Sequence, residues 1–416
     1  MTKEQIRHLM RKTSSHHTKE QREAAAQRLF ARIEQSSIFA ISRTIALYCA
    51  LPDEVPTRAT IERWGSLGRQ IVVPRITSAS TMEFYPYDAQ QMQRGAFGID
   101  EPTGDTPIEP SAIDLTIVPG VAFCAEGSRL GRGAGYYDRY LSRQGYAAYN
   151  ISICLPHQLL PSLPCAPHDQ TMDWVVCEDK VGCDEEIPTT ATIISRVLEA
   201  AGVDANRLGC GIDRLNAMGL SWVLLRYSMV VDRAPQRGEE IVIETWISSC
   251  SRIASTREFI LRSRSGEQIG VASTQWAMID LESRHAVNLI ESELNYSQFV
   301  SDRPTTLSVV RRLPESNCPT IDFEHCVDSA DIDFNRHVNT LRYVELMLAA
   351  QPIELRRHIA SSRVDLHFAS ESRLGDTLSI EHTMLDEDSA KGEKRGLFAI
   401  RRSDGTLSAS GVFGWL

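Results

Sequence analysis

Apolar residues in the first part of the chain occur alternately at helical and at extended spacing. An amphipathic segment near Ala25–Ile33 starts with Thr18 and Gln21 at capping-box spacing. Short apolar runs follow it, with helical stretches between several of them, at Thr44–Tyr48, Ile71–Val73, Leu115–Val118 and Ala148–Ile153. Strands that alternate with helices are typical of a mainly parallel sheet, so this pattern predicts an N-terminal α/β domain.

The pattern changes after an acidic segment that ends in proline, residues 177–188 (CEDKVGCDEEIP). One amphipathic helix is predicted over 190–202, and long extended segments follow it. These segments are Trp222–Val231, Glu240–Ser248, Ile253–Arg262 and Gly270–Leu281. The pattern predicts a helix followed by an antiparallel meander.

The last hundred or so residues repeat this plan. A helix is predicted near 339–349, and strands are predicted at Arg363–Ala369, Thr377–Thr383, Arg395–Arg402 and Leu407–Phe413. One helix followed by antiparallel strands, twice over, suggests tandem hot-dog folds, in which a sheet wraps around its helix. We therefore expect an α/β domain over 1–180, followed by α+β hot-dog domains over 185–310 and 318–416.

Composition and charge limit the functional classes. The 416 residues, 42% hydrophobic and 24% charged, fit a folded protein of more than one domain. A net charge of −10 argues against broad binding of nucleic acid. The charged start MTKEQIRHLMRK lacks the apolar core of a signal peptide, and no apolar run reaches membrane-spanning length. Ten cysteines without a C-x-x-C pair are typical of reduced thiols, so we expect a cytoplasmic protein without membrane insertion.

A glycine-rich run, Gly127–Asp138 (GSRLGRGAGYYD), leaves a predicted strand and enters a predicted helix. Glycines allow the backbone to approach phosphate oxygens closely, and a helix N-terminus directs amide donors at them. Arg129 and Arg132 add cations, and Asp138 adds a carboxylate that suits magnesium. The run predicts phosphate binding, with a plain tight connection as the alternative.

A second polar cluster, Asp333, Asn335 and His337, lies just before the helix predicted near Asn339. A helix N-terminus favours an oxygen that becomes negative during acyl transfer, and histidine can act as a general acid or base near neutral pH. The alternative is that Asp and Asn only cap the helix. The cluster holds more polar residues than one cap needs, which favours catalysis.

Residues 1 to about 178 resemble the 5-formyltetrahydrofolate cyclo-ligases (5,10-methenyltetrahydrofolate synthetases). The segments that carry the resemblance are Lys3-x-x-x-Arg7, Tyr48–Thr57, Gly95–Pro102, Arg129–Asp138 and His168–Asp173. The resemblance implies ATP-dependent cyclisation of 5-formyltetrahydrofolate to 5,10-methenyltetrahydrofolate, with release of ADP and phosphate. Charge neutralisation and alignment are the main requirements of such a reaction, which needs no covalent nucleophile.

This resemblance implies three sets of site residues. ATP contacts fall on Lys3, Arg7, Arg129, Leu130, Gly131, Arg132, Gly133, Ala134, Gly135, Tyr136 and Tyr137. Folate contacts fall on Cys49, Glu54, Arg132, Gly133, Gly135 and Tyr136. Mg²⁺ is expected on Asp138 and Asp169. One position departs from the family, because Cys124 stands where members commonly carry Asp.

From about Glu185 to its end the chain resembles the acyl-acyl-carrier-protein thioesterases, most of all the bacterial members. The segment SADIDFNRHVNTLRYVELML contains their Asp-x-Asn-x-His-Val-Asn-x-x-x-Tyr pattern, and Gly219–Arg226 and Ser273–Arg284 support the match. The resemblance implies hydrolysis of acyl-[acyl carrier protein] thioesters to free fatty acid, with acyl carrier protein as a partner. It implies a catalytic set of Asp333, Asn335, His337 and Glu371.

Ser372 stands where some of these relatives carry cysteine. We therefore expect a water activated by Glu371, with Asn335 and His337 polarising the thioester carbonyl and Asp333 orienting them. Together the two halves predict a bifunctional enzyme. Because a thiol is a poor substitute for a carboxylate, Cys124 motivates the alternative, a thioesterase whose N-terminal domain only binds folate or nucleotide.

Overall fold

The computed structural model describes residues 1–14, 17–95, 98–178, 188–236, 238–291, 294–315, 319–333, 335–352, 355, 361–388 and 392–415. The chain forms two compact units, the first reaching residue 187 and the second starting at Pro188. The segment between the first two expected domains, and residues 316–318 before the third, lie outside the described residues. The domain limits given above therefore stay predictions.

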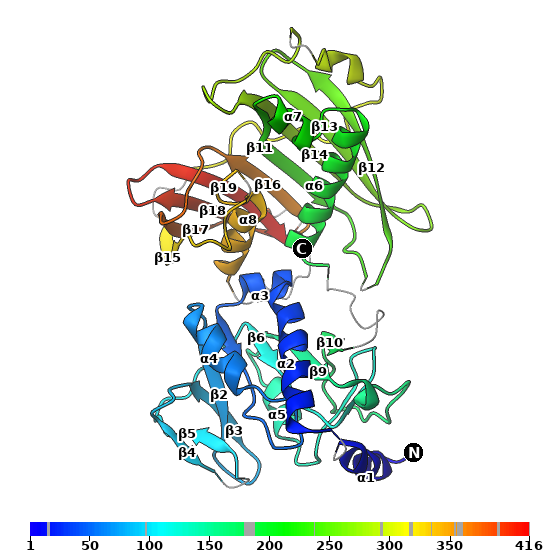
Figure 1. Cartoon of the computed structure of the whole chain (residues 1–416), viewed down its shortest axis with the longest axis vertical. Coiled ribbons are helices and arrows are strands. Elements are labelled where there is room, and N and C mark those ends of the chain that lie inside the picture. Colours follow the sequence, from blue (N-terminus) through cyan, green and yellow to red (C-terminus); the bar gives the residue numbers. More distant parts are fainter. Residues whose placement is uncertain are drawn as a thin grey trace. The chain divides into compact units, whose positions relative to one another are not determined.

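A mainly parallel sheet forms the centre of the first unit (Figure 1). Its strands are β1 (Thr44–Ala46), β2 (Gln70–Ile76), β3 (Met82–Pro86), β6 (Leu115–Ile117), β9 (Tyr149–Cys154) and β10 (Trp174–Cys177). They follow the order β10-β9-β6-β1-β2-β3, and only β3 is antiparallel to its neighbour. The predicted α/β fold is confirmed, with β3 as an antiparallel edge strand that was not predicted.

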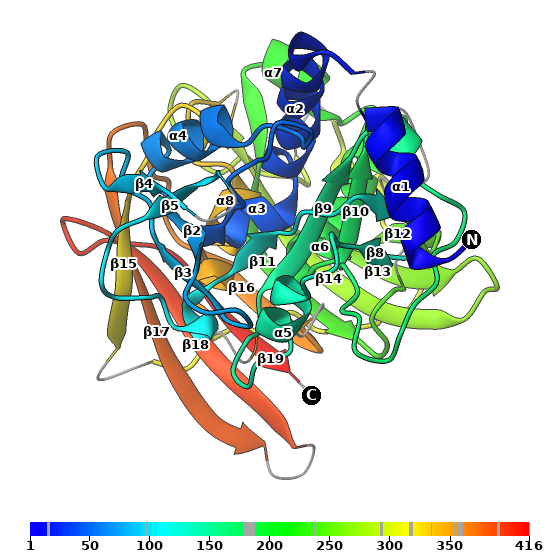
Figure 2. The same ribbon diagram turned by 90° about the horizontal axis from the view of Figure 1, so that it is seen from below.

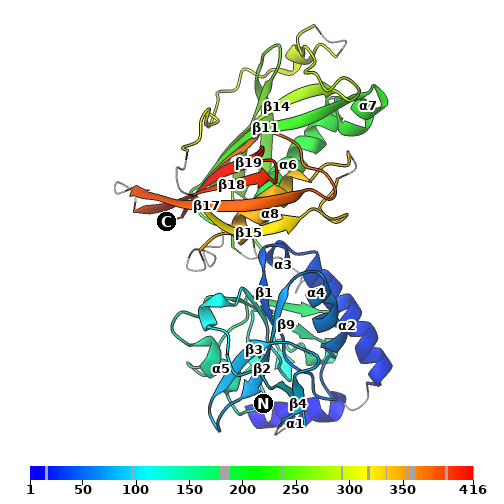
Figure 3. The same ribbon diagram turned by 90° about the vertical axis from the view of Figure 1, so that its left-hand side faces the viewer.

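Helices cover this sheet, and Figure 3 shows α2 and α5 on opposite sides of it. The helices of the unit are α1 (Lys3–Ser14), α2 (Lys19–Glu34), α3 (Ser37–Ile41), α4 (Arg58–Ser66) and α5 (Tyr136–Leu141), with 3-10 turns η1 (Pro110–Ala112) and η2 (Pro156–Gln158). Short strand pairs are β4 (Met92–Arg94) with β5 (Asp100–Pro102) and β7 (Ala122–Phe123) with β8 (Arg129–Leu130). The predicted capping box of α2 is present, since Thr18 and Gln21 exchange both hydrogen bonds.

A large antiparallel sheet dominates the second unit. Its strands are β11 (Leu220–Val231), β12 (Ile241–Cys250), β13 (Ser255–Ser263), β14 (Gln268–Asp280), β15 (Thr320–Cys326), β16 (Arg363–Phe368), β17 (Thr377–Asp388), β18 (Glu393–Arg402) and β19 (Leu407–Trp415). They follow the order β12-β13-β14-β11-β16-β19-β18-β17-β15. The β17 and β18 strands extend beyond the rest of the sheet (Figure 2). The tandem hot-dog architecture is confirmed, with β15 as an unpredicted edge strand.

Each half of this sheet packs against its own helix. The helices are α6 (Thr190–Arg207), α7 (Ile212–Ala217) and α8 (Thr340–Ala349), and η3 (Tyr296–Phe299) is a 3-10 turn. Strand β11 pairs with β14 of the first hot-dog and with β16 of the second, so the two hot-dogs share one sheet. In the described part of the chain, no helix has the length and apolar character that crossing a bilayer requires.

Candidate functional sites

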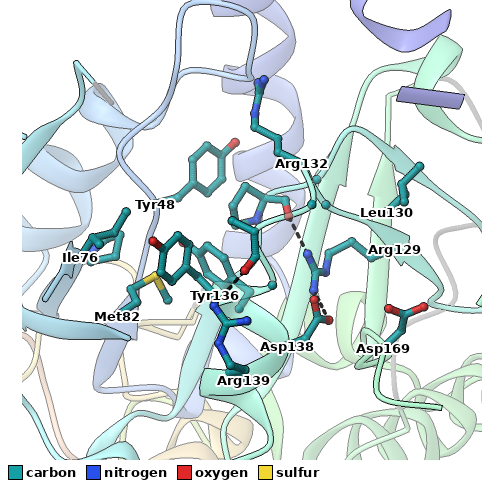
Figure 4. Close-up of a pocket in the computed structure, with 18 of the residues that line it drawn as sticks. Tyr48, Ile76, Met82, Arg129, Leu130, Arg132, Tyr136, Asp138, Arg139 and Asp169 are labelled. Atoms are coloured by element: carbon teal, nitrogen blue, oxygen red, sulfur yellow. Dashed lines mark hydrogen bonds and ion pairs between the residues drawn. The ribbon is translucent and has the colours of Figure 1, made fainter. Parts of the chain in front are cut away.

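A cavity of about 840 Å³ opens in the first unit, next to the glycine-rich run. It is lined by every residue that the sequence assigned to ATP, folate or magnesium: Lys3, Arg7, Cys49, Glu54, Arg129, Leu130, Gly131, Arg132, Gly133, Ala134, Gly135, Tyr136, Tyr137, Asp138 and Asp169. Figure 4 shows charged side chains such as Arg129, Asp138 and Asp169 on one side, and Ile76 and Met82 on the other. The cavity therefore has a charged end and an apolar end.

Glycines with positive φ shape the run, two of them next to the helix that follows. Gly133 and Gly135 have φ of 111° and 68°, a region that side chains other than glycine seldom adopt. A Cβ atom on Gly133 would lie 3.5 Å from the guanidinium carbon of Arg7. Arg7 itself reaches from α1 and donates from Nε to the Gly131 carbonyl oxygen at 2.9 Å. The first helix is thus fixed against the loop, and its cation lies beside the backbone of the run.

Ion pairs organise the charged end. Arg129 Nη2 lies 2.6 Å from Asp138 Oδ1, and this oxygen also accepts a hydrogen bond of 3.1 Å from the Gln170 amide. Lys3 Nζ lies 2.5 Å from Asp169 Oδ2, which accepts from the Ala166 amide at 2.6 Å. Burial opposes ionisation of Asp169, but the bonds from Lys3 and Ala166 outweigh it, and the pKa of the carboxyl lies below its usual value.

The protein supplies only part of a magnesium coordination shell. Among the described residues, no three His, Cys, Asp or Glu side chains gather as a metal site. Asp138 and Asp169 line the same cavity, and both carry hard oxygen donors. Magnesium is usually held by one or two carboxylates together with substrate phosphates, so these two residues fit such an ion.

Glu54 and Cys49 lie on another part of the wall. Arg132 contacts Glu54 Oε1 at 3.1 Å through Nε and Asp53 Oδ1 at 2.7 Å through Nη2. Burial raises the pKa of Glu54 above its usual value, although the Leu51 amide and Arg132 oppose this. Burial, with the charges of Asp100 and Glu101, raises the pKa of Cys49 to about 12. This thiol stays protonated at neutral pH, so it can contact a substrate but is not a thiolate nucleophile.

The apolar end contains residues that the sequence analysis did not assign to the site. These are Leu51, Pro74, Ile76, Met82 and Ile99, with the carboxylate of Glu101 among them. Ile76 and Met82 belong to β2 and β3, so in the sequence they look like ordinary strand residues. The Glu101 carboxyl group lies against Gly95, at a position where a Cβ atom on residue 95 would clash with it. Residues 96 and 97 of this motif lie outside the described residues.

Cys124 is buried, 3% exposed, and is not among the described residues that line the cavity. The backbone holds its turn: the Cys124 amide donates to the Ser128 carbonyl at 3.0 Å, and the Gly127 amide donates to the Cys124 carbonyl at 3.0 Å. Met172 donates from its amide to the Gly127 carbonyl at 2.8 Å. Backbone hydrogen bonds therefore support this loop without a carboxylate at position 124.

The second site lies in the second unit, on the loop that precedes α8. Asp333 Oδ1 accepts hydrogen bonds from the Asn335 amide at 2.8 Å and the His337 amide at 3.3 Å, and the Asp333 amide donates to the His337 carbonyl at 2.9 Å. Asn339 caps α8, since its side chain accepts from the Leu341 amide at 2.8 Å. The interpretation of Asp333 and Asn335 as mere helix caps is therefore wrong.

Glu371 comes from the loop after β16 and meets this cluster. His337 Nε2 lies 3.1 Å from Glu371 Oε2, which joins two residues of the predicted catalytic set. Arg284, from the first hot-dog, forms an ion pair with the other oxygen, Oε1. Arg402 Nη1 donates to the Glu371 backbone carbonyl at 2.7 Å. Sequence reasoning missed both arginines as site residues.

Asp331 is another residue that the sequence analysis missed. It is buried, and its carboxylate accepts from His325 Nε2, Arg342 Nε and the Asp328 amide at 2.7, 2.7 and 2.9 Å. Burial opposes its ionisation, but these partners outweigh burial and lower its pKa to about 2. Its backbone carbonyl accepts from the Asn339 amide at 2.8 Å, so Asp331 anchors both ends of the loop that carries Asp333 and His337.

Family models match both parts of the chain. Residues 1–178 match the 5-formyltetrahydrofolate cyclo-ligase family, residues 168–295 the N-terminal domain of acyl-ACP thioesterase, and residues 320–415 its C-terminal domain.

Individual proteins match the same two parts. A probable 5-formyltetrahydrofolate cyclo-ligase of Schizosaccharomyces pombe is 33% identical over 156 residues, which cover 33% of this chain and 76% of that protein. The chloroplastic palmitoyl-acyl carrier protein thioesterase of Arabidopsis thaliana is 25% identical over 158 residues, 36% of this chain, and the chain spans only 38% of its length. The solved acyl-ACP thioesterase of Bacteroides thetaiotaomicron is 28% identical, with 54% of this chain and 88% of that chain covered and a TM-score of 0.48.

Proposed function

We propose that this chain, which belongs to the 5-formyltetrahydrofolate cyclo-ligase family and also carries both acyl-ACP thioesterase domains, is a bifunctional enzyme. Its first unit cyclises 5-formyltetrahydrofolate to 5,10-methenyltetrahydrofolate with ATP as the second substrate. Its second unit hydrolyses acyl-[acyl carrier protein] thioesters to free fatty acid and carrier. The alternative, a first domain that only binds its ligands, rests on Cys124, which lies outside the described lining of the cavity.

The cavity of the first unit carries the cyclo-ligase proposal, because it offers both a polyphosphate end and an apolar end for a pterin ring. In the reaction, the formyl oxygen attacks the γ-phosphorus of ATP and ADP leaves. The second folate nitrogen then attacks the activated formyl carbon and loses its proton as the ring closes. The bond between that carbon and its oxygen breaks, and the oxygen leaves with phosphate, which takes up the proton. Lys3, Arg7 and Arg129 would neutralise the phosphates, and Arg132 with Glu54 would align the folate.

The proposal includes a magnesium ion bound in this cavity. Asp138 and Asp169 would hold the ion, which when bound neutralises charge on the phosphates. Arg129 forms an ion pair with Asp138, and Lys3 forms one with Asp169.

The magnesium assignment can be tested with Asp138→Asn. We expect the Mg²⁺ concentration for half-maximal cyclisation to rise about tenfold or more, since one of two charged ligands is lost. Formation of the methenyl product is followed by its near-ultraviolet absorbance. Asp88→Asn, a change at an exposed turn residue outside the described lining of the cavity, is the matched control. An unchanged Mg²⁺ dependence in Asp138→Asn would remove Asp138 from the metal site.

The contact between His337 and Glu371 carries the thioesterase proposal. Glu371 would take a proton from the attacking water, while Asn335 and His337 polarise the thioester carbonyl. Asp333 would act through its bonds to the amides of these two residues, which fix the loop. The bond between carbonyl carbon and sulfur then breaks, and the carrier leaves as its thiol.

Location and partners complete the proposal. The cysteines that the structure describes are free thiols, which supports a cytoplasmic location. The net charge of −10 argues against nucleic acid as a partner. We keep the domain limits 1–180, 185–310 and 318–416 as part of this proposal.

A further inference from the structure

Arg284 is the residue of the first hot-dog that contacts the proposed catalytic carboxylate. Strands β14 and β16 are both antiparallel to β11, so they run in the same direction. The turn after β14 carries Arg284, and the loop after β16 carries Glu371. The segments that follow the two strands therefore leave the shared sheet toward the same end, although 87 positions separate these residues in the sequence.

The turn that holds Arg284 has an unusual backbone. Arg284 has a φ of 61°, a left-handed conformation that is uncommon for residues other than glycine, asparagine and aspartate. Asp280 stabilises this turn: its Oδ1 accepts from the Ser283 amide at 2.7 Å and from Ser283 Oγ at 2.8 Å, and its carbonyl accepts from the Arg284 amide at 2.9 Å. A strained conformation that its surroundings maintain is often found at a functional site.

Arg284 and His337 share one carboxylate. Arg284 Nη2 pairs with Glu371 Oε1, while His337 Nε2 lies 3.1 Å from Glu371 Oε2. Among the described residues, the Glu371 side chain pairs with no basic side chain other than these two. Each oxygen thus has one partner, and together the two partners fix the plane of the carboxylate.

We propose that Arg284 is a positioning residue of the thioesterase site, which holds Glu371 in the orientation needed to activate water. This inference rests on the proposed hydrolysis of acyl thioesters. It gives the first hot-dog, which lacks the Asp-x-Asn-x-His cluster, a direct part in the geometry of the reaction. Arg284 acts through Glu371 and does not itself touch the substrate.

The test compares the full-length protein with Arg284→Ala and Arg284→Lys on two substrates, an acyl-[acyl carrier protein] and an acyl thioester of N-acetylcysteamine, which has no carrier. We expect Arg284→Ala to lower kcat on both substrates by about tenfold to a hundredfold, the usual cost of losing a group that orients a reacting residue. KM should change by less than about threefold on either substrate. Arg284→Lys should recover part of kcat, and millimolar guanidinium should recover part of it in Arg284→Ala.

Arg264→Ala is the matched control, because Arg264 is an exposed arginine of the same hot-dog that pairs with Glu240. It should keep kcat within about twofold, as expected for a surface ion pair. The thermal unfolding midpoint of each sample checks that the second unit of the variant is folded.

Two results would overturn the inference. One is an unchanged kcat in Arg284→Ala. The other is a raised KM for the carrier substrate alone with normal turnover of the carrier-free thioester, which would make Arg284 a docking residue for the carrier. Inactivity of the unmodified protein on both substrates would instead overturn the proposed hydrolysis itself.

Discussion

Glu371 and Ser372 are neighbours in the sequence but have different surroundings. The Glu371 side chain is 34% exposed and meets His337, whereas Ser372 is completely buried. Ser372 Oγ shares a hydrogen bond of 2.8 Å with Ser408 Oγ, and its amide donates to Tyr343 Oη at 3.0 Å. Ser372 therefore fixes the loop, whereas Glu371 is the residue that the proposed hydrolysis uses.

This difference predicts that substitutions at the two adjacent positions change kcat by very different amounts. Glu371→Gln should lower kcat for acyl-[acyl carrier protein] by at least about a hundredfold, because the amide cannot accept the proton of water. Ser372→Ala should keep kcat within about tenfold, since it removes a buried hydrogen bond but no reacting group. Release of free fatty acid measures both. Loss of turnover in a folded Ser372→Ala variant would instead indicate that Ser372 acts as a nucleophile.

Only some residues of this site could be predicted from the sequence. The motif Asp333-x-Asn335-x-His337 is local, so its spacing alone indicates one loop. Arg284 could not be predicted, because it meets Glu371 only after β14, β11 and β16 have assembled into one sheet.

At the scale of elements, the C-terminal end of helix α1 contacts a pair of histidines. Ser14, the last residue of α1, lies with its Oγ 3.1 Å from His157 Nε2, and the rings of His17 and His157 stack with centroids 4.4 Å apart. Burial, and to a lesser extent the charge of His17, lower the pKa of His157 to about 4. The folded state therefore favours neutral His157. The cations Lys3 and Arg7 lie in the N-terminal half of the same helix.

The sign of the pH effect follows from this shift. The contribution of neutral His157 is fully present above the ordinary histidine pKa of about 6.5, and it is lost progressively as pH falls from there toward about 4. We expect α1 to loosen over this range, so that the KM for ATP rises as pH falls below about 6.5. His157→Gln, which keeps a hydrogen-bond partner for Ser14 but does not titrate, should flatten this rise.

Steady-state kinetics of cyclisation between about pH 7.5 and 5 measure the effect. His8→Gln, an exposed position on the same helix, is the control and should retain the pH dependence. If the KM of His157→Gln followed the same pH profile as the unmodified protein, His157 would not be the group that couples α1 to pH.

Elements were predicted from the sequence where their pattern was strong. The capping box of α2 and its apolar face at Ala25, Leu29, Phe30 and Ile33 were correct, since these residues are buried. Strand β15 was missed because most of its side chains are exposed or half-buried at the sheet edge, which removes the alternation that indicates a strand. The antiparallel edge strand β3 was missed as well.

At the scale of the whole molecule, the sequence predicted two unrelated catalytic units, and the structure forms two compact units with separate candidate sites. Each set of predicted residues lies within one unit: the cavity residues in the first, and Asp333, Asn335, His337 and Glu371 in the second. The two reactions share no intermediate. We therefore expect that a change in one site leaves the other activity intact.

One measurement tests this account most directly: a single purified preparation assayed for methenyl absorbance with 5-formyltetrahydrofolate, ATP and Mg²⁺, and for fatty-acid release from acyl-[acyl carrier protein]. The unmodified protein should show both activities. Lys3→Ala should lose most of the first activity alone, because it removes a cation from the phosphate end of the cavity, and Glu371→Gln should lose the second alone. Fatty-acid release without any methenyl absorbance in the unmodified protein would contradict the account and select the alternative of a non-catalytic first domain.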